Sequence, residues 1–314
     1  MIGLVYFLGS LVVYCAILYT ILRSFPKAFF LLTFVVLTFY KNNRAINYTE
    51  LIDLKWMPPK IVNYEQKRMS NQWEMMYSQT WIKALFGGSL NVIENTLERV
   101  LSERDRVFSI GAGAGGVEPF LFQAMKRNAT VYLSDLVPHT ERYRVLKERF
   151  FPFVDSIDDP VDIFDLPNVT HGNPLLVAAT LHHFEPHQVR RIFVTAIENR
   201  SPILLMDGTP SVSTLLLLPL QALSCSIWTG IVDGILEMDP LLLFLTFSGI
   251  LPAIAFHDNI CSALRFYSEN DLVRILKTIP ESETYKWDWS AMGLQPFNFG
   301  VGVPILFETD TCAP

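Results

Sequence analysis

The sequence predicts an α/β fold with a doubly wound, largely parallel sheet, to which two apolar regions are added. From residue 105 onward, short β-branched and aromatic runs alternate with helix-like segments, as in a parallel sheet covered by helices on both faces. Five of these runs end in Gly, Asp, Thr or His. The excess apolar residues gather instead at the N-terminus and between residues 213 and 256.

The composition excludes several classes of protein. Half of the 314 residues are hydrophobic, 18% are charged, and the mean hydropathy is +0.29, so polar surface is scarcer than in an ordinary soluble domain. The net charge of −6 disfavours a nucleic-acid partner, because phosphate binding needs clustered Lys and Arg. The four Cys are too scattered for a disulfide framework or a zinc site, and we expect no metal.

Residues 1–44 are predicted to anchor the chain in a membrane. Residues 1–22 carry no charge, and as a helix they would reach about 33 Å, which spans a bilayer. A signal peptide is the alternative, but neither a basic start nor a small-residue cleavage site precedes Arg23. The run 28–40 is shorter and is expected to lie at the interface or to continue a bent span. Lys and Arg after the first span predict that the catalytic domain faces the cytosol.

Two further regions read as helical. Residues 45–100 are expected to form an amphipathic cap, in which Gln66–Leu85 carries aromatic and Met side chains at helical spacing, either as core packing or as a lid over a ligand. The apolar insert 213–256 is broken at Asp239-Pro240 into two helices. These are either buried core helices or a hairpin that dips into the membrane or roofs an apolar pocket. The domain that carries the insert is expected to span 101–314.

The middle of the chain alternates regularly between strand and helix. Strands are predicted at Arg106–Ile110, Ala129–Leu133, Val161–Phe164, Pro174–Ala179 and Pro202–Met206, and helices at 117–126, 141–149 and 186–199. Ligands bind outside the carboxyl ends of such strands, where the strand order reverses. The polar residues after the five strands are therefore expected to share one edge of the sheet.

The first strand end predicts a nucleoside-bearing cofactor. Gly111-Ala-Gly-Ala-Gly-Gly116 fits both the dinucleotide fingerprint and the loop that binds S-adenosylmethionine. Glycines permit a tight turn and bring backbone N–H groups close to a ligand at the start of a helix. Asp135 ends the second strand about 20 residues later, where an acid can accept both ribose hydroxyls. The alternative is a glycine-rich turn without a ligand.

The stretch from Val107 to Phe184 resembles the class I S-adenosylmethionine-dependent methyltransferases. The likeness lies in the glycine motif, in Leu133-Ser-Asp135 and in Leu181-His-His-Phe184. With the C-terminal region it covers roughly residues 90–314, and it implies a Rossmann-like, seven-stranded sheet with an antiparallel final strand.

The last elements fit that sheet. Ser268 is expected to cap a helix through Lys277. Tyr285–Trp289 and Val303–Glu308 alternate as two strands, which the resemblance pairs as a final antiparallel hairpin.

The resemblance also implies a set of cofactor-binding residues. They are Ser109, Gly111, Ala112, Gly113, Gly115, Asp135, Leu136, Asp165, Leu166, Thr180 and His182. Asp165 and Leu166 would flank the adenine, with Thr180 and His182 beneath it. Family members usually carry Asp or Glu two residues before the first glycine, where it helps to anchor the methionine moiety. This chain has Ser109 there, and a hydroxyl cannot supply charge, so the methionyl amino group needs another partner.

A catalytic base is needed only if the methyl acceptor must lose a proton. His183, His257 and Asp258 are the candidates, together with His182. Alternatively, at least one of the two adjacent histidines is a structural hydrogen-bonding residue, and His257 simply bounds the apolar insert. His182, His183 and His187 follow no defined ligand spacing, so they do not predict a metal site.

Together these patterns predict a membrane-anchored enzyme that transfers a methyl group from S-adenosylmethionine to a hydrophobic or membrane-resident small molecule. One alternative is a membrane-bound NAD(P)-dependent oxidoreductase, although no Tyr-x-x-x-Lys pair is placed to activate a carbonyl or an alcohol. The other is a non-catalytic membrane module with the same fold, which Ser109 favours.

Overall fold

The computed structural model divides the chain into two compact units. The helical unit comprises Met1–Gln79 and Pro210–Phe266, and the sheet unit comprises Thr80–Thr209 and Tyr267–Pro314. The structure describes residues 9, 12–17, 19–20, 49–78, 93–98, 100–101, 105–125, 129–165, 172–291 and 297–305.

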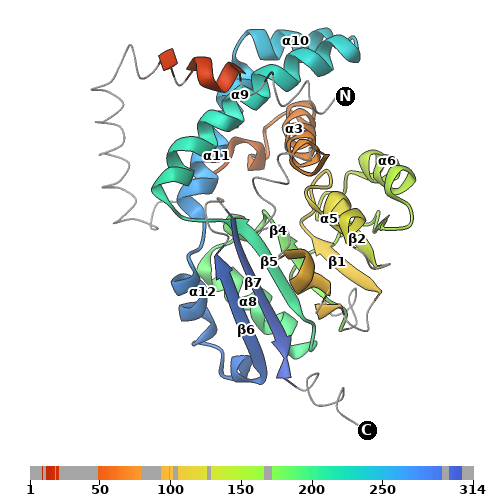
Figure 1. Cartoon of the computed structure of the whole chain (residues 1–314), viewed down its shortest axis with the longest axis vertical. Coiled ribbons are helices and arrows are strands. Elements are labelled where there is room, and N and C mark those ends of the chain that lie inside the picture. The colour runs from red at the N-terminus through yellow and green to blue at the C-terminus, as the bar shows by residue number, and fades with distance from the viewer. Residues whose placement is uncertain are drawn as a thin grey trace. The chain divides into compact units, whose positions relative to one another are not determined.

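The sheet unit contains a seven-stranded sheet of order β3-β2-β1-β4-β5-β7-β6 (Figure 1). The strands are β1 (Arg106–Ile110), β2 (Thr130–Ser134), β3 (Val154–Ser156), β4 (Leu175–Ala178), β5 (Ile203–Gly208), β6 (Tyr285–Ala291) and β7 (Phe297–Pro304). β1 to β5 run parallel, and β7 is antiparallel to both β5 and β6. The predicted seven strands with an antiparallel final strand are confirmed, and the strand order reverses between β1 and β4.

The central strands of this sheet are buried along almost their whole length because helices cover it. β4 and β5 are buried at every residue, as expected for strands with both faces covered. The flanking helices are α5 (Glu118–Ala124), α6 (Thr140–Phe150), α8 (Pro186–Glu198) and α12 (Glu269–Leu276). α5 packs against α6, and α8 packs against α12. Phe193 of α8 and Leu272 of α12 share one buried core with Leu205 of β5.

The start of α12 confirms a capping prediction. The Ser268 hydroxyl accepts a hydrogen bond from the Asp271 backbone N–H, and the Asp271 side chain accepts one from the Ser268 backbone N–H. This reciprocal pair satisfies two backbone donors that a helix start otherwise leaves without partners.

The predicted strand Val161–Phe164 is wrong, because the third strand lies earlier, at Val154–Ser156. Asp162 makes a turn instead, since its Oδ1 accepts from the Phe164 N–H at 2.9 Å and its carbonyl accepts from the Asp165 N–H at 2.9 Å. Val161 and Ile163 are nonetheless buried. They are therefore apolar because they lie in a loop that packs onto the core, and not because they form a strand.

The final strand also lies earlier than predicted, at Phe297–Pro304 instead of Val303–Glu308. Its Gly300 and Gly302 face Trp289 and Trp287 of β6, whose rings fill the space that a side chain would take. Phe297, Phe299, Val301 and Val303 alternate in the sequence with Asn298 and the two glycines, so the alternation begins six residues before the predicted strand.

Besides the helical residues described at 12–17 and 19–20, the helical unit contains four helices and a short 3-10 turn among the described residues. These are η1 (Leu51–Asp53), α3 (Pro59–Ser78), α9 (Val212–Leu236), α10 (Pro240–Phe247) and α11 (Ile250–Arg265). α9 packs against α3, α10 and α11. Asp239 caps α10 by accepting from the backbone N–H groups of Leu241 and Leu242. Gly249, with φ of +79°, then separates α10 from α11, so the second predicted helix of the insert is two.

Among the described residues, one helix is long and apolar enough to cross a membrane, at Ser213–Leu236, and half of its most apolar window is buried in the protein. α10 and α11 pass the same test only as a pair bent by 65°. Most of the predicted span 1–22 and all of 28–40 lie outside the described residues, so the N-terminal anchor stays a prediction. Where the N-terminal stretch is described, Gly9 lies directly against the Trp228 ring of α9.

Candidate functional site

The glycine loop after β1 makes a tight turn that is tied to the neighbouring strand. Gly111, Gly113 and Gly115 all have positive φ angles, of 72°, 54° and 80°. The buried Ala112 donates its N–H to the Ser134 carbonyl at 3.0 Å, and the Gly115 N–H donates to the Ala112 carbonyl at 2.8 Å. Backbone rather than side chains therefore forms the surface of this loop, which suits the close approach of a ligand.

Asp135, at the end of β2, is fixed by the loop beside it. Its Oδ2 accepts from the Gly113 N–H at 2.8 Å, and its Oδ1 accepts from the Val137 N–H at 2.9 Å. Each carboxylate oxygen can accept two hydrogen bonds, so with respect to the described residues each retains one acceptor position. Two adjacent hydroxyls of a ligand would fill these positions. The neighbouring Leu136 is 61% exposed and offers an apolar surface next to them.

Thr180 joins the end of β4 to the same loop. Its Oγ1 lies 2.9 Å from the Gly111 carbonyl and 2.9 Å from the Ala178 carbonyl, and the one hydroxyl hydrogen serves one of them at a time. Ala179, which lies between Ala178 and Thr180 in the sequence, has φ of +51°, in the left-handed region that a residue with a Cβ rarely adopts. Thr180 thus joins the carboxyl end of β4 to the glycine loop, at the point where the strand order reverses.

His182 is held by a carboxylate that sequence analysis left without a role. The His182 backbone N–H donates to Asp207 Oδ2 at 2.9 Å, and its Nδ1 lies 2.8 Å from Asp207 Oδ1. Because an ionised carboxylate only accepts, this geometry assigns the Nδ1–H tautomer to a neutral imidazole. Both side chains are buried, and the His183 ring lies against the His182 ring at 4.4 Å between centroids. The signal for Asp207 was its position, directly at the end of the fifth strand.

Ser109 is also paired with an acid that sequence analysis missed. Its hydroxyl donates to Glu118 Oε1 at 2.6 Å, and both residues are buried. Burial raises the pKa of Glu118, while the hydrogen bonds from Ser109 and from backbone N–H groups act in the opposite direction. An acid among apolar residues directly behind the glycine loop was the available signal.

The predicted adenine-flanking pair is only partly described. Asp165 is exposed and closes the turn that begins at Asp162. Leu166 lies outside the described residues, so the contacts of this pair with adenine stay a prediction.

His257 and Asp258 lie in the helical unit, on α11, whereas the other described candidate residues lie in the sheet unit. Asp258 Oδ1 accepts from the Leu51 N–H at 2.7 Å, and its Oδ2 accepts from the Ile52 N–H at 3.2 Å. His257 Nδ1 lies 2.8 Å from the same Oδ1. Asp258 therefore holds η1 against α11, and its carboxylate is already committed to structural hydrogen bonds.

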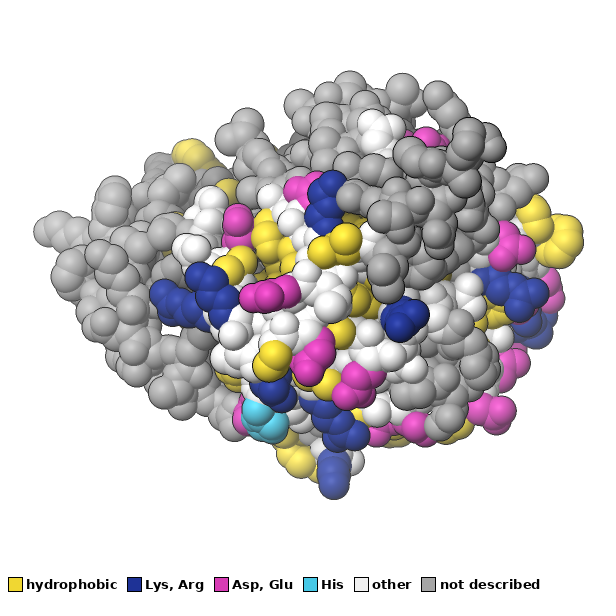
Figure 2. All heavy atoms as spheres, turned by 90° about the horizontal axis from the view of Figure 1, so that it is seen from below, with side chains coloured by type: hydrophobic (Ala, Val, Ile, Leu, Met, Phe, Trp, Pro, Cys, Tyr) yellow, Lys and Arg dark blue, Asp and Glu magenta, His cyan; other side chains and the backbone are white. Residues whose placement is uncertain are grey.

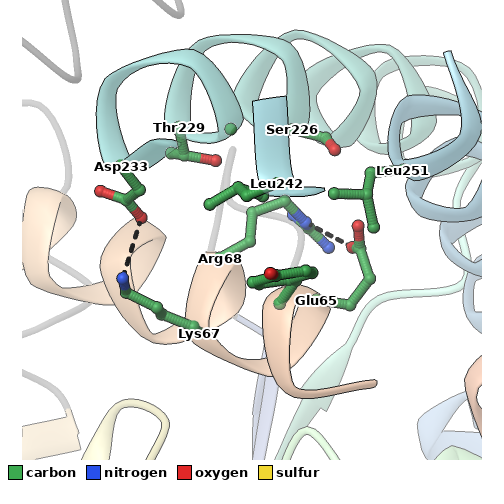
Figure 3. Close-up of a pocket in the computed structure, with 10 residues that line it drawn as sticks. Glu65, Lys67, Arg68, Ser226, Thr229, Asp233, Leu242 and Leu251 are labelled. Carbon is green, nitrogen blue, oxygen red and sulfur yellow. Dashed lines mark hydrogen bonds and ion pairs between the residues drawn. The ribbon is translucent and has the colours of Figure 1, made fainter. Parts of the chain in front are cut away.

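A small polar pocket lies inside the helical unit, between α3 and the helices of the insert (Figure 3). Arg68 Nε donates to Glu65 Oε2 at 2.7 Å, and Lys67 Nζ lies 3.5 Å from Asp233 Oδ2 of α9. The cavity measures about 10 Å³, which is room for about one water molecule. It is too small for a methyl acceptor, and we interpret it as a polar contact that orients α3 on α9.

No family model matches the chain, and no curated protein matches its sequence. Several solved structures are similar to it in fold. An O-methyltransferase family protein from Burkholderia thailandensis is 11% identical, with a TM-score of 0.45, and the match covers 78% of this chain and 61% of that one. A putative O-methyltransferase from Nostoc punctiforme is 13% identical, with a TM-score of 0.43, over 96% of this chain and 71% of that one.

Magnesium protoporphyrin IX methyltransferase from Synechocystis, with bound SAH, is 14% identical, with a TM-score of 0.41, over 78% of this chain and 98% of that one. The chain thus spans about three fifths of the Burkholderia protein and nearly all of the Synechocystis protein. At these identities and TM-scores the likeness carries no argument about this chain, and the function must be argued from the residues of the site.

Proposed function

We propose that this chain is an S-adenosylmethionine-dependent methyltransferase that acts on a hydrophobic or membrane-resident small molecule. One observation carries the proposal. The residues that follow β1, β2 and β4 hydrogen-bond to one another at the carboxyl edge of the sheet, through Gly113 to Asp135 and through Thr180 to Gly111. This edge, at the reversal of strand order, is where doubly wound sheets bind their ligands.

The residues present suit this cofactor. Asp135 would hold the ribose hydroxyls through its two remaining acceptor positions, and Leu136 would contact the adenine. The backbone of the loop from Gly111 to Gly115 would lie along the methionyl end, because its glycines let backbone N–H groups come close to a ligand. When bound, S-adenosylmethionine supplies a methyl group already activated for displacement, so positioning accounts for most of the acceleration.

An acceptor that must lose a proton would transfer it to the histidine pair after β4. Asp207 orients the His182 ring and places the proton on Nδ1, which makes Nε2 its basic atom. His183, which packs on that ring, is the second candidate. His257 remains a candidate from the helical unit, whereas the hydrogen bonds of Asp258 favour a structural role.

An apolar ledge on the helical unit supports a membrane location. It consists of five large side chains between 62% and 85% exposed, at the end of α9 and on α10, namely Ile235, Leu236, Met238, Phe244 and Phe247. Five such side chains within residues 235–247 favour a surface that binds a membrane or another protein. By contrast, on the face in Figure 2 the hydrophobic side chains lie scattered among acidic and basic ones.

Cofactor binding by the purified chain in detergent tests the proposal. S-adenosylmethionine and S-adenosylhomocysteine should raise the melting temperature by mass action, while NAD and NADP should not. Asp135→Ala should abolish that shift, and the exposed Asp159→Ala should leave it unchanged. A shift with NAD(P) alone would favour the oxidoreductase, and unchanged binding by Asp135→Ala would contradict the proposed site.

The oxidoreductase alternative lacks an accessible catalytic pair among the described residues. Tyr143 and Lys147 of α6 have the Tyr-x-x-x-Lys spacing, but Tyr143 is fully buried and burial raises its pKa. Lys147 Nζ is paired with Asp155 Oδ1 at 2.7 Å. A tyrosine that donates a proton to a carbonyl needs access to substrate, so this pair is structural. Labelled methyl products in membranes that express the chain would exclude the non-catalytic alternative.

Flotation with liposomes tests the membrane location. Phe244→Ser/Phe247→Ser should reduce liposome binding at least tenfold, because a fully buried Phe side chain contributes about 1.5–3 kcal/mol. Phe151→Ser, at an exposed position of the sheet unit, serves as the control and should leave binding unchanged. Equal losses in both variants, or no loss in either, would show that the ledge does not contact lipid.

A further inference from the structure

The histidine pair lies in a single short turn after β4. This turn, η2 (Leu181–His183), follows Thr180, and the Phe184 N–H closes it by donating to the Leu181 carbonyl at 3.2 Å. A 3-10 turn of this length has few hydrogen bonds of its own, and their geometry is poorer than in an α-helix. The orientation of the turn therefore depends on contacts from other elements.

Two side chains supply such contacts, one on each side of His183. Asp207, on β5, accepts hydrogen bonds from the backbone N–H and the ring of His182. The Tyr267 hydroxyl donates to the Phe184 carbonyl at 2.7 Å. Because His183 lies between the two residues held in this way, its backbone is fixed from both directions.

Tyr267 can hold the turn because its own position is fixed by packing. Its side chain is 5% exposed and belongs to the buried core of the sheet unit. Phe184 packs against the same core, and its ring meets that of Phe164 edge-on, with 5.7 Å between the centroids. A hydrogen bond between two groups that packing already orders costs little further conformational entropy.

His183 is the more accessible residue of the pair. His182 is 5% exposed, whereas His183 is partly exposed, and 4.4 Å separates the two ring centroids. A base must reach the proton that it accepts, which favours His183. A displacement of about 1 Å can cost a reacting group about a hundredfold in rate, so the contacts that fix this turn bear directly on the chemistry.

Asp207 and Tyr267 also stand at the two ends of the apolar insert. The insert forms the segment Pro210–Phe266 of the helical unit. Asp207 comes shortly before this segment, and Tyr267 is the first residue after it. Phe266, its last residue, is buried in a core of the helical unit. The chain therefore joins both ends of the insert to residues that hold the histidine turn.

We propose that Tyr267 is a positioning residue for the histidine pair. Its hydroxyl holds the Phe184 carbonyl while Asp207 holds His182, and together they set the place of the His183 ring. This inference rests on the proposed function, in which His183 is a candidate base. Tyr267 acts through the main chain of the turn and not on the reacting atoms.

Tyr267→Phe removes only the hydroxyl, and Tyr285→Phe is its matched control. Tyr285 is also 5% exposed and belongs to the same core, and its hydroxyl lies 3.0 Å from the Ala196 carbonyl and 3.2 Å from that of Ser201. Each variant loses a hydrogen bond to a backbone carbonyl, so both should show a similar decrease in melting temperature. Only Tyr267→Phe should change the histidine turn.

NMR of the full chain in detergent, with isotope-labelled histidine, gives a readout that lost stability alone does not move. The His183 signals are identified by their loss in His183→Gln. Tyr267→Phe should shift the His183 ring signals. It should also speed hydrogen exchange of the His183 N–H, which donates to the Thr180 carbonyl, about two- to tenfold, as expected for the loss of one ordinary hydrogen bond. The ring signals of His139, in the same unit, should not move, and Tyr285→Phe should leave all of these signals unchanged.

Two further measurements connect the turn to the reaction. Tyr267→Phe should keep the Kd for S-adenosylhomocysteine within about twofold, and it should lower labelled methyl transfer into a lipid extract about tenfold at saturating cofactor, because only the positioning of the base changes. Tyr285→Phe should alter neither quantity.

Three outcomes overturn the inference while leaving the proposed function intact. These are unchanged His183 signals in Tyr267→Phe, equal changes in Tyr267→Phe and Tyr285→Phe, and a rate of methyl transfer equal to that of the unsubstituted chain. If the unsubstituted chain does not bind S-adenosylhomocysteine, the proposed function fails, and the role of Tyr267 in that function fails with it.

Discussion

Replacing Gly111 with Ala should destabilise the sheet unit by more than the backbone strain alone. A φ of +72° costs a residue with a Cβ about 1–2 kcal/mol. The added methyl group would also lie 2.5 Å from Thr180 Cγ2 and 3.1 Å from its Oγ1. Overpacking of this kind costs about 1–3 kcal/mol. The expected total is therefore about 2–5 kcal/mol.

Gly249 provides a matched control. Its φ of +79° is similar, but an added Cβ would meet nothing within 4 Å. Gly249→Ala should then cost only the backbone strain of about 1–2 kcal/mol. Because the two glycines lie in different units, native-state hydrogen exchange is the appropriate assay, since it reports opening free energies segment by segment. Peptides from β1 and β4 report on Gly111, and peptides from α10 and α11 report on Gly249.

A second substitution separates the strain from the steric contact. Thr180→Ser removes the Cγ2 methyl and keeps the hydroxyl that bonds to the Gly111 carbonyl. In a Gly111→Ala/Thr180→Ser variant the part of the loss caused by the 2.5 Å contact with Cγ2 should be recovered, while the backbone part and the closer approach to Oγ1 should remain. The reasoning is refuted if Gly111→Ala costs no more than Gly249→Ala, or if Thr180→Ser recovers nothing.

Three further predictions concern buried charges. Asp207→Asn should lower the free energy of unfolding by urea by about 1.5–3 kcal/mol, because it weakens two charge-assisted hydrogen bonds to His182. It should also lower the rate of methyl transfer. Stability equal to that of the wild type would contradict the geometry. Arg68→Met should lower the free energy of unfolding by about 3–5 kcal/mol, because Glu65 is left buried without its partner. The double variant Glu65→Leu/Arg68→Met should regain most of this loss. If the losses of the two single substitutions simply add in the double variant, the two residues are not coupled. Because burial raises the pKa of Glu118, the native state binds more protons than the unfolded state, and stability should fall as pH rises from the ordinary carboxyl range through that raised pKa. Glu118→Gln should flatten this part of the dependence of the urea midpoint on pH, and an unchanged dependence would mean that another group titrates.

The parts of the fold around the candidate site that were predicted correctly are local in the sequence. The strand Arg106–Ile110 and the glycine loop lie next to each other, and Asp135 follows at the end of the next strand. Each is recognisable because the residue type and its position along one element determine its use. The predicted strand Val161–Phe164 was wrong because a local apolar run does not distinguish a strand from a buried loop.

The contacts of Asp207 and Glu118 were not predicted, because they are made with residues that come close only when the chain folds. Asp207 meets His182 across two neighbouring parallel strands, 25 residues apart. Glu118 meets Ser109 only because the intervening loop reverses the chain. In both cases the sequence shows an acid at a strand end or behind a loop, while the hydrogen bond that defines its use is a tertiary contact.

Backbone strain gives an argument for this edge that does not depend on any resemblance. Three residues other than glycine have positive φ among those that the structure describes, namely Ala179, Arg200 and Met238, at 51°, 52° and 51°. Arg200 and Met238 come directly after the C-caps of α8 and α9, where a left-handed residue commonly ends a helix. Ala179 follows a strand, β4, and ends no helix. Strain of order 1–3 kcal/mol persists where the surrounding structure enforces it, and it concentrates at ligand sites. Here the enforcing contacts are those of Thr180 to the Gly111 loop, so the strained residue lies at the edge that the cofactor proposal requires.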